Sequence, residues 1–352
     1  MTKHSTIYAW LKENISNGTF KTGERITSEN QLCRQFNISR QTARQAISSL
    51  EQEGLVTKKR GSGTYVNDAP TAPRSKKVAI LTTYTYDYIL ANIIAGMQTI
   101  INKYQYSMVL RSSSNKVQLE RNHLVELLSS DIDGLIVEGA KTAIHSPNIE
   151  LYKRFKDKNI PIVFINGYFE NFDCNYVIND DVLGGRLCTR HLIENGHTKI
   201  GAIFKHDDIQ GKMRYKGYID ELLAHGREIN EEKIMWYSTE SLEYIFKYPN
   251  LLMNIFDDCT AIMCYNDQIS LKLLQLYRDI GFNKSIISFD NTSLCDISYI
   301  PLTSLSHPGS YLGKLATESL IKMMQNPNYE VKHIFEPYLV ERSSVKKIYA
   351  AD

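Results

Sequence analysis

Apolar residues recur every three or four positions between Ser5 and Gly54, a spacing typical of amphipathic helices. The pattern predicts one helix over about residues 5–17 and a second that begins at Ser28 and runs to Phe36. Ser28 is followed three residues later by Gln31, an arrangement that marks the start of a helix. Because a third helix is predicted from Ser39, only two residues separate the second helix from the third.

The third predicted helix has two faces of opposite character. Its apolar stripe must pack inward, and it consists of Ala43, Ala46, Ile47 and Leu50. The opposite face carries Arg40, Gln41, Arg44, Gln45 and Ser48. Arg and Gln side chains match the edges of guanine and adenine in the major groove, and here they lie toward the amino end of the helix. Such a face alone is more often merely solvated.

A basic hairpin is predicted directly after the third helix. The string L-V-T-K-K-R-G-S-G-T-Y-V predicts two short strands around Gly61-Ser62-Gly63, with Lys58, Lys59 and Arg60 beside the tip. Cations at a hairpin tip next to a recognition helix suit phosphates or the minor groove. Three helices followed closely by this hairpin predict a winged helix-turn-helix of the α+β class.

From Val78 the pattern changes to short apolar runs that alternate with amphipathic helices, which predicts parallel sheets with right-handed crossovers. This alternation of strands and helices occurs in two successive parts of the chain, so we expect two doubly wound sheets on either side of a ligand cleft. The preceding stretch, N-D-A-P-T-A-P-R-S-K-K, is typical of a linker. We therefore expect a head at 1–68, a linker at 69–77 and a body at 78–352, with subdomains at about 78–167 plus 306–328 and about 168–305 plus 329–352.

Polar residues follow the predicted strands of the body, at the edge where ligands bind in such folds. Each buried hydroxyl of a polyhydroxy ligand needs a donor or an acceptor, so these residues favour a small polar ligand. Tyr84, Tyr86 or Tyr88 would stack on a sugar, although core packing explains such a tyrosine at least as well. The strand-end residues are Tyr84 to Asp87, Glu138, Asn166, Lys205, Asn266, Asp267, Asp290 and His307, and helix capping explains Asp267 equally well.

Charge divides the chain unequally. Residues 1–77 hold 13 Lys+Arg and 6 Asp+Glu, a net +7, whereas the rest of the chain holds 28 and 33, a net −5. A basic head on an acidic body favours a polyanionic partner for the head.

The six scattered cysteines argue against a disulfide framework or a zinc site. The absence of a signal peptide or a long apolar run indicates a cytoplasmic protein without a membrane span.

Two parts of the chain resemble known families. The string T-S-E-N-Q-L-C-R-Q-F-N-I-S-R-Q-T-A-R-Q-A-I, followed by R-G-S-G-T-Y-V, resembles the GntR-type DNA-binding head. The motifs R-H-L-I-E-N-G-H-T-K-I-G-A-I, A-I-M-C-Y-N-D-Q-I-S, S-F-D-N and P-L-T-S-L-S-H-P resemble, in that order, the sensor domain of LacI/GalR-type repressors. This implies a type I periplasmic-binding-protein-like fold. His191 and His197 belong to that motif, so no metal site is expected there.

The pairing of these two parts resembles the arabinose repressors, and strings such as T-T-Y-T-Y-D-Y-I and F-K-H-D-D-I-Q-G are similar to that family in particular. The resemblance implies a homodimer that binds double-stranded operator DNA, is released by L-arabinose and uses no cofactor. The candidate DNA-binding residues are Lys3, Arg40, Gln41, Thr42, Arg44, Lys58, Lys59, Arg60, Gly61 and Ser62. The candidate effector-binding residues are Tyr84, Tyr86, Asp87, Glu138, Asn166, Lys205, Arg214, Asn266, Asp290 and His307. Gln41 and Arg60 depart from the family pattern, which bears on the operator sequence rather than on operator binding.

Three alternatives differ in what they require of the sequence. An enzyme is disfavoured because the chain has no nucleophile elbow, P-loop, dinucleotide fingerprint or H-E-x-x-H motif, so no catalytic residue is assigned. A solute-binding transport protein is disfavoured by the basic head. The same repressor architecture with another pentose, a hexose or a nucleoside as its effector stays open.

Overall fold

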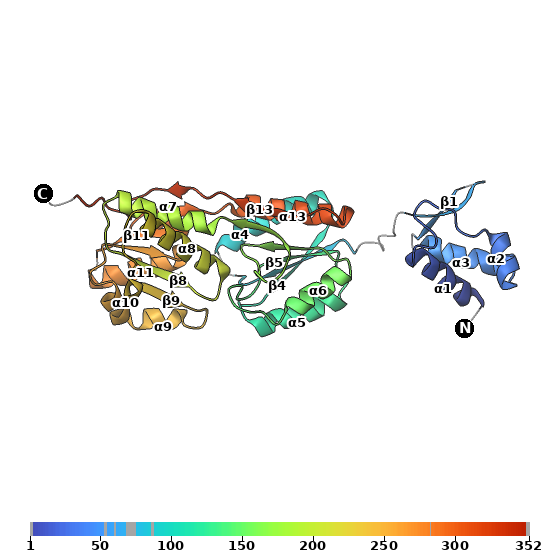
Figure 1. Ribbon diagram of the computed structural model, residues 1–352, viewed down its shortest axis with the longest axis horizontal. Coiled ribbons are helices and arrows are strands. Elements are labelled where there is room, and N and C mark those ends of the chain that lie inside the picture. The colour runs from blue at the N-terminus through green and yellow to red at the C-terminus, as the bar shows by residue number, and fades with distance from the viewer. Residues whose placement is uncertain are drawn as a thin grey trace. The chain divides into compact units, whose positions relative to one another are not determined.

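The computed structural model describes residues 3–52, 55–59, 61–67, 75–85, 88–281 and 283–349. The chain divides into two compact units, residues 1–75 and 76–352, drawn in Figure 1. We call the described part of the first unit up to residue 67 the head and that of the second unit the sensor domain. The expected combination of a winged helix-turn-helix with an α/β periplasmic-binding-protein-like domain is confirmed.

The head consists of three helices and a two-stranded hairpin. Its elements are α1 (Lys3–Ser16), α2 (Glu29–Phe36), α3 (Arg40–Gln52), β1 (Val56–Lys59) and β2 (Gly63–Val66). The capping box is present, because the Ser28 amide donates to Gln31 Oε1 at 3.0 Å and the Gln31 amide donates to Ser28 Oγ. The four residues of the predicted α3 stripe are buried in one core with Ile7, Leu11 and Leu32. Local periodicity therefore placed the head's core correctly.

The sensor domain contains two lobes, each built on a six-stranded sheet. In the first lobe the strand order is β13-β7-β6-β5-β3-β4 and every pair is parallel. These strands are β3 (Lys77–Thr82), β4 (Ser107–Ser112), β5 (Gly134–Val137), β6 (Ile162–Ile165), β7 (Asn175–Asn179) and β13 (Lys332–Phe335). Helices α4 (Tyr88–Lys103) and α13 (Gly309–Gln325) cover one face, and α5 (Val117–Ser129) and α6 (Ile149–Asp157) cover the other (Figure 1).

The second lobe has the strand order β14-β12-β11-β10-β8-β9, and only its β14–β12 pair is antiparallel. Its strands are β8 (Ile200–Lys205), β9 (Ile234–Tyr237), β10 (Ala261–Cys264), β11 (Ser285–Asp290), β12 (Thr303–Ser306) and β14 (Leu339–Val340). Helices α7 (Asp181–Glu194) and α8 (Ile209–Ala224) pack on one face. On the other face lie α9 (Leu242–Lys247), α10 (Pro249–Ile255) and α11 (Asp267–Ile280), while α12 (Leu294–Ile297) and a short 3-10 helix (Glu231–Lys233) occupy connections.

The structure corrects the expected domain boundaries in two places. Strands β7 and β13 belong to the first sheet, because β7 pairs with β6 and β13 pairs with β7, although both were assigned to the second subdomain. Lys76 and Lys77, assigned to the linker, belong to the sensor domain, since Lys77 is the first residue of β3 and pairs with Ser107. The remaining linker residues, apart from Ser75, lie outside the described residues.

The chain crosses between the lobes three times, near residue 180, at 307–308 and at 336–338, as the sheet memberships of the flanking elements require. Three connecting segments are the arrangement that lets two lobes move as bodies about a shared hinge. Among the helices that the structure describes, none is long and apolar enough to cross a membrane.

Candidate functional site

A polar cleft of about 520 Å³ separates the two lobes of the sensor domain, at the carboxyl ends of the strands. Eight of the ten candidate effector-binding residues line it: Tyr84, Glu138, Asn166, Lys205, Arg214, Asn266, Asp290 and His307. The other two, Tyr86 and Asp87, lie outside the described residues. The structure therefore brings together residues as far apart in the chain as Tyr84 and His307, and their role in binding stays a prediction.

The first-lobe wall is a chain of hydrogen bonds with a fixed direction. Asn166, which directly follows β6, donates from Nδ2 to Glu138 Oε1 at 2.8 Å. The other carboxylate oxygen of Glu138 accepts from both side-chain hydroxyls of Thr82 and Thr83 at 2.7 Å and from the Thr83 amide. Glu138 is thus held as an acceptor, and Asn166 as a donor, at the floor of the cleft.

His307 continues this chain in a defined tautomer. The Gly309 amide donates to Nδ1 at 3.1 Å, so Nδ1 carries no proton and Nε2–H donates to Asn166 Oδ1 at 3.2 Å. Burial between the lobes, with a smaller contribution from the Arg214 cation, lowers the pKa of His307 to about 3. The imidazole is therefore neutral at physiological pH.

Arg214, on α8, is the buried cation of the second-lobe wall. Its Nε donates to Asp181 at 2.7 Å, its Nη1 donates to the Tyr265 carbonyl, and its Nη2 lies 3.8 Å from Asp290. The guanidinium also lies over the rings of Tyr265 and Phe289. Burial alone would lower the pKa of Arg214, but Asp181 and Asp290 outweigh it, so the pKa is raised and the group stays charged.

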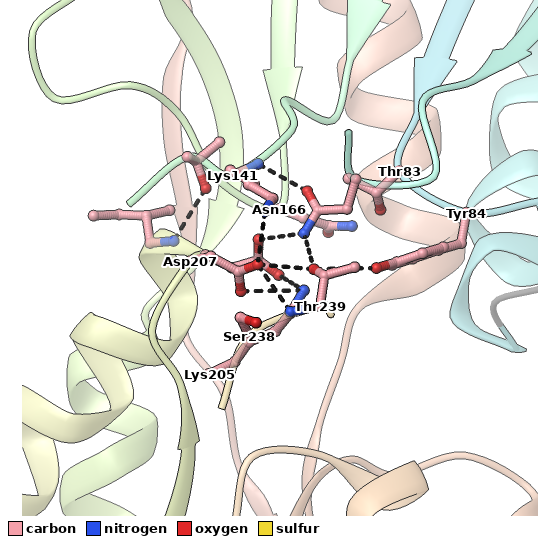
Figure 2. Close-up of polar contacts among 12 residues, drawn as sticks. Thr83, Tyr84, Lys141, Asn166, Lys205, Asp207, Ser238 and Thr239 are labelled. Carbon is pink, nitrogen blue, oxygen red and sulfur yellow. Dashed lines mark hydrogen bonds and ion pairs between the residues drawn. The ribbon is translucent and has the colours of Figure 1, made fainter. Parts of the chain in front are cut away.

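Lys205, the last residue of β8, is the second buried cation. Its Nζ lies 3.7 Å from Asp207 (Figure 2). It also bonds to Asp208 and stands over the ring of Tyr84. Burial opposes the charge, yet the two carboxylates hold the pKa of Lys205 above its usual value. Lys205 thus stays charged while its charge is balanced within the protein.

Contacts across the cleft join the lobes at several places, and two of them involve tyrosines of the first lobe. Thr239, which follows β9 of the second lobe, accepts from Asn115 Nδ2 at 2.7 Å and from the Tyr84 hydroxyl at 3.4 Å, and donates to Asp207 (Figure 2). At the other place the hydroxyl of Tyr88, at the start of α4, donates to Asp290 at 3.1 Å. These contacts describe an arrangement in which the two lobes touch.

Asp267 is a candidate that does not line the cleft. It is fully buried at the start of α11, and its carboxylate accepts from Thr292 and Ser304. The helix is capped instead by its neighbour Asn266, whose Oδ1 accepts from the Ile269 amide at 3.0 Å. The capping explanation thus applies to Asn266.

Several lining residues were not among the predicted binding residues: Tyr88, Asp208, Gln210, Tyr237, Thr239, Tyr265 and Gln268. Tyr88 was considered only for stacking. Asp208 lies three residues past Lys205, the last residue of β8, so the strand-end rule applied three positions further would have found it. Tyr237 and Thr239 depend on β9, which the alternating pattern did not predict.

The head presents its candidate DNA-binding residues to solvent. Arg40, Gln41, Arg44, Lys58, Lys59, Gly61 and Ser62 are exposed, and Thr42 is half-buried against the capping hydroxyl of Ser39. Lys58 forms an ion pair with Glu29 at 3.0 Å, which connects the hairpin to α2. Arg60 and the side chain of Lys3 lie outside the described residues. DNA contact by this surface stays a prediction.

Comparisons with known proteins cover both units. Residues 3–66 match the family "Bacterial regulatory proteins, gntR family", and residues 189–345 match "Periplasmic binding protein-like domain". The arabinose metabolism transcriptional repressors of Halalkalibacterium halodurans and Geobacillus stearothermophilus are each 34% identical over 97% of this chain, covering 96% and 98% of their own lengths. The crystal structure of the transcription regulator CcpA of Lactococcus lactis aligns with a TM-score of 0.68 at 25% identity, over 77% of this chain and 99% of that one.

A GntR-type winged helix on a two-lobed sensor domain with a polar cleft defines a transcription regulator that responds to a small molecule. The full-length similarity narrows this class. The chain belongs to the family of arabinose metabolism transcriptional repressors. It is a sugar-responsive repressor and not an enzyme, as its relatives are regulators.

Proposed function

We propose that this repressor binds operator DNA as a homodimer and that L-arabinose, bound in the cleft of the sensor domain, releases it. The observation that carries the proposal is the similarity to two arabinose metabolism repressors over nearly the whole chain, with both the head and the cleft residues included. The geometry of the cleft supports it independently, because its polar groups suit a small neutral ligand.

The two buried cations of the cleft favour a neutral polyhydroxy compound over an anion. Lys205 is paired with Asp208, and Arg214 is paired with Asp181 and Asp290, so neither cation is available to balance a phosphate or a carboxylate. Hydroxyl groups, in contrast, both donate and accept. Glu138 and Asp290 would accept from sugar hydroxyls, and the amide nitrogen of Asn266 would donate, since its oxygen is occupied by the helix cap.

The head supplies the operator-binding surface in this proposal. Arg40, Gln41 and Arg44 would reach base edges from α3 in the major groove, while Lys58 and Lys59 would contact phosphates from the hairpin. A symmetric dimer places two such heads on the two halves of a near-palindromic operator. DNA as the partner places the protein in the cytoplasm, and the sugar is the only small molecule that the mechanism requires.

Coupling follows from a difference in affinity between two arrangements of the lobes. A sugar that contacts both walls favours their closed arrangement, and the three crossover segments would transmit the change to the spacing of the heads. Linkage then requires that operator DNA weaken sugar binding by the same factor by which sugar weakens operator binding. If bound operator leaves sugar affinity unchanged, this coupling is wrong.

The test is a titration of the full-length repressor on a labelled operator duplex, selected by binding from a random DNA library. L-arabinose, D-xylose, D-ribose and D-galactose are added in parallel at fixed salt. Release by arabinose alone is the expected result. Release by another sugar replaces the effector and keeps the repressor, and failure to select any duplex overturns operator binding.

A further inference from the structure

The last residue of β11 and the residue after it have an unusual backbone. Asp290 has φ of +102° and Asn291 has φ of +45°, and neither residue is a glycine. Residues with a Cβ disfavour this left-handed region, so two in succession persist only where the surroundings hold them. The turn presents Asp290 to the cleft, where its carboxylate accepts from Tyr88 of the first lobe and lies 3.8 Å from Arg214.

The side chain that holds this turn is Asp267. Its Oδ2 accepts from both the amide of Thr292, at 2.8 Å, and the hydroxyl of Thr292, at 3.0 Å. Its Oδ1 accepts from the Ser304 hydroxyl at 2.7 Å, and the same hydroxyl oxygen accepts from the Asn291 amide at 3.0 Å. Two consecutive amides of the turn are therefore bound, directly or through Ser304, to one buried carboxylate.

Asp267 is buried at the start of α11 but does not cap that helix. Asp267 is fully buried, and burying a carboxylate is costly unless hydrogen bonds satisfy it. The helix cap is already provided by Asn266, which itself lines the cleft. Asp267 thus links two cleft residues, Asn266 beside it in the chain and Asp290 across the turn, without touching the cleft.

We propose that Asp267 is a positioning residue for the sugar site, because it locks the positive φ angles of Asp290 and Asn291, which aim Asp290 into the cleft. The inference rests on the proposed function for the identity of the ligand. The hydrogen bonds by which Asp267 holds residues 291 and 292 are present in the protein without a ligand. It assigns Asp267 an effect on sugar affinity that acts through Asp290.

The chain offers a matched pair of serines for the test. Ser304 and Ser344 are both buried in the second lobe, and each donates one hydrogen bond and accepts one from a backbone amide. Ser304 braces the carboxyl end of β11, whereas Ser344 bonds to Ile286 near its amino end. Ser304→Ala and Ser344→Ala therefore lose similar numbers of hydrogen bonds at opposite ends of the strand.

Binding of L-arabinose is measured calorimetrically on the full-length wild type, Asp267→Asn, Ser304→Ala and Ser344→Ala. We expect Asp267→Asn and Ser304→Ala to weaken sugar binding by about 3- to 10-fold, as the loss of one or two hydrogen bonds predicts, and Ser344→Ala to leave it unchanged. In an Asp290→Asn background, Ser304→Ala should change sugar affinity less than about twofold, since its effect acts through Asp290. The proposal is overturned if Ser304→Ala weakens sugar binding equally in the wild-type and Asp290→Asn backgrounds. It is also overturned if Ser304→Ala and Ser344→Ala weaken sugar binding equally.

Hydrogen exchange of the free protein separates this inference from the proposed function. The Asn291 and Thr292 amides should exchange faster in Asp267→Asn and Ser304→Ala than in the wild type, while the amides of β10 keep their protection. Unchanged exchange at 291–292 overturns the bracing whatever sugar binds. If the wild type binds no arabinose, the proposed effector is wrong, and the exchange result still decides whether Asp267 holds the turn.

Discussion

The head and the cleft use polar side chains in opposite ways. On α3, Arg40, Gln41 and Arg44 are exposed, as a surface that must meet another molecule requires. In the cleft, Lys205 and Arg214 are almost fully buried, and their charges are balanced by Asp208, Asp181 and Asp290. Both regions contain cations, but Arg40 and Arg44 are exposed on α3, whereas Lys205 and Arg214 are buried and paired with carboxylates.

This contrast shows why the same residue types serve a polyanion in one place and a neutral ligand in the other. Exposed cations release counterions from DNA and contribute affinity through their charge. Buried cations paired with carboxylates contribute geometry, since they fix the acceptors around them and leave little charge to attract an anion. The predictions below test this division of roles.

The largest expected effect is that of Arg214→Ala, which should abolish release by sugar while sparing operator binding without sugar. The substitution leaves Asp181 and Asp290 without their buried counter-charge, so the free energy of unfolding should fall by about 3–5 kcal/mol. Sugar titrations by calorimetry and operator binding check both parts. Arg186→Ala removes an exposed ion pair with Asp220 and should change neither. Sugar release retained by Arg214→Ala would contradict the assignment.

Arg44→Ala should show the opposite phenotype. Loss of a bidentate base contact should cost about 1–3 kcal/mol of operator binding, while the sugar dissociation constant of the free repressor stays unchanged. Lys21→Ala, which removes another exposed cation outside the candidate surface, is the control for net charge. Equal losses in the two variants would mean that charge alone, rather than the face of α3, accounts for operator binding.

Thr239→Val should weaken sugar binding by about 2- to 10-fold, the range expected when net hydrogen bonds are lost. The substitution keeps the shape of the side chain but removes its hydroxyl contacts with Asn115 and Tyr84 across the cleft and with Asp207. Thr189→Val is the control, because that buried hydroxyl bonds within α7 and to Met263 of the same lobe. Unchanged affinity in Thr239→Val would show that the contacts between the lobes do not favour the bound arrangement.

The smallest expected effect is that of pH on sugar binding. Because the pKa of His307 is about 3 in the folded protein, its imidazole stays neutral, and sugar affinity should show no step near pH 6.5. Stability behaves differently, since the unfolded chain binds a proton at His307 and the folded protein does not. This contribution is complete above about pH 6.5 and is lost as pH falls toward 3. The urea midpoint of the wild type should therefore fall more steeply between pH 7.5 and 4.5 than that of His307→Gln, and parallel curves would contradict the neutral state.

Much of the cleft followed from one rule, that residues after parallel strands converge at one edge of the sheet. Glu138, Asn166 and Asp290 were found in this way, and the resemblance to repressors added Arg214, which lies within α8 and follows no strand. Thr239 was missed because β9 is short and its alternation is weak. The rule also singled out Asp267, but the side chain of Asp267 bonds to Thr292 and does not line the cleft. The sequence near Asp267 does not predict this contact, because Thr292 lies beyond both α11 and β11 in the chain.

The sequence by itself determined the winged helix, its exposed basic face, the two-lobed class of the sensor domain and most of its polar lining. These depend on periodicity and on residues close together in the chain, where the geometry of helices and strands dictates which side chains share a face. Only the tertiary structure decided that β7 and β13 complete the first sheet, which cations are balanced by which carboxylates, and that Asp267 holds the turn of Asp290. Those outcomes depend on strand pairing and burial between distant segments, which local sequence patterns do not specify.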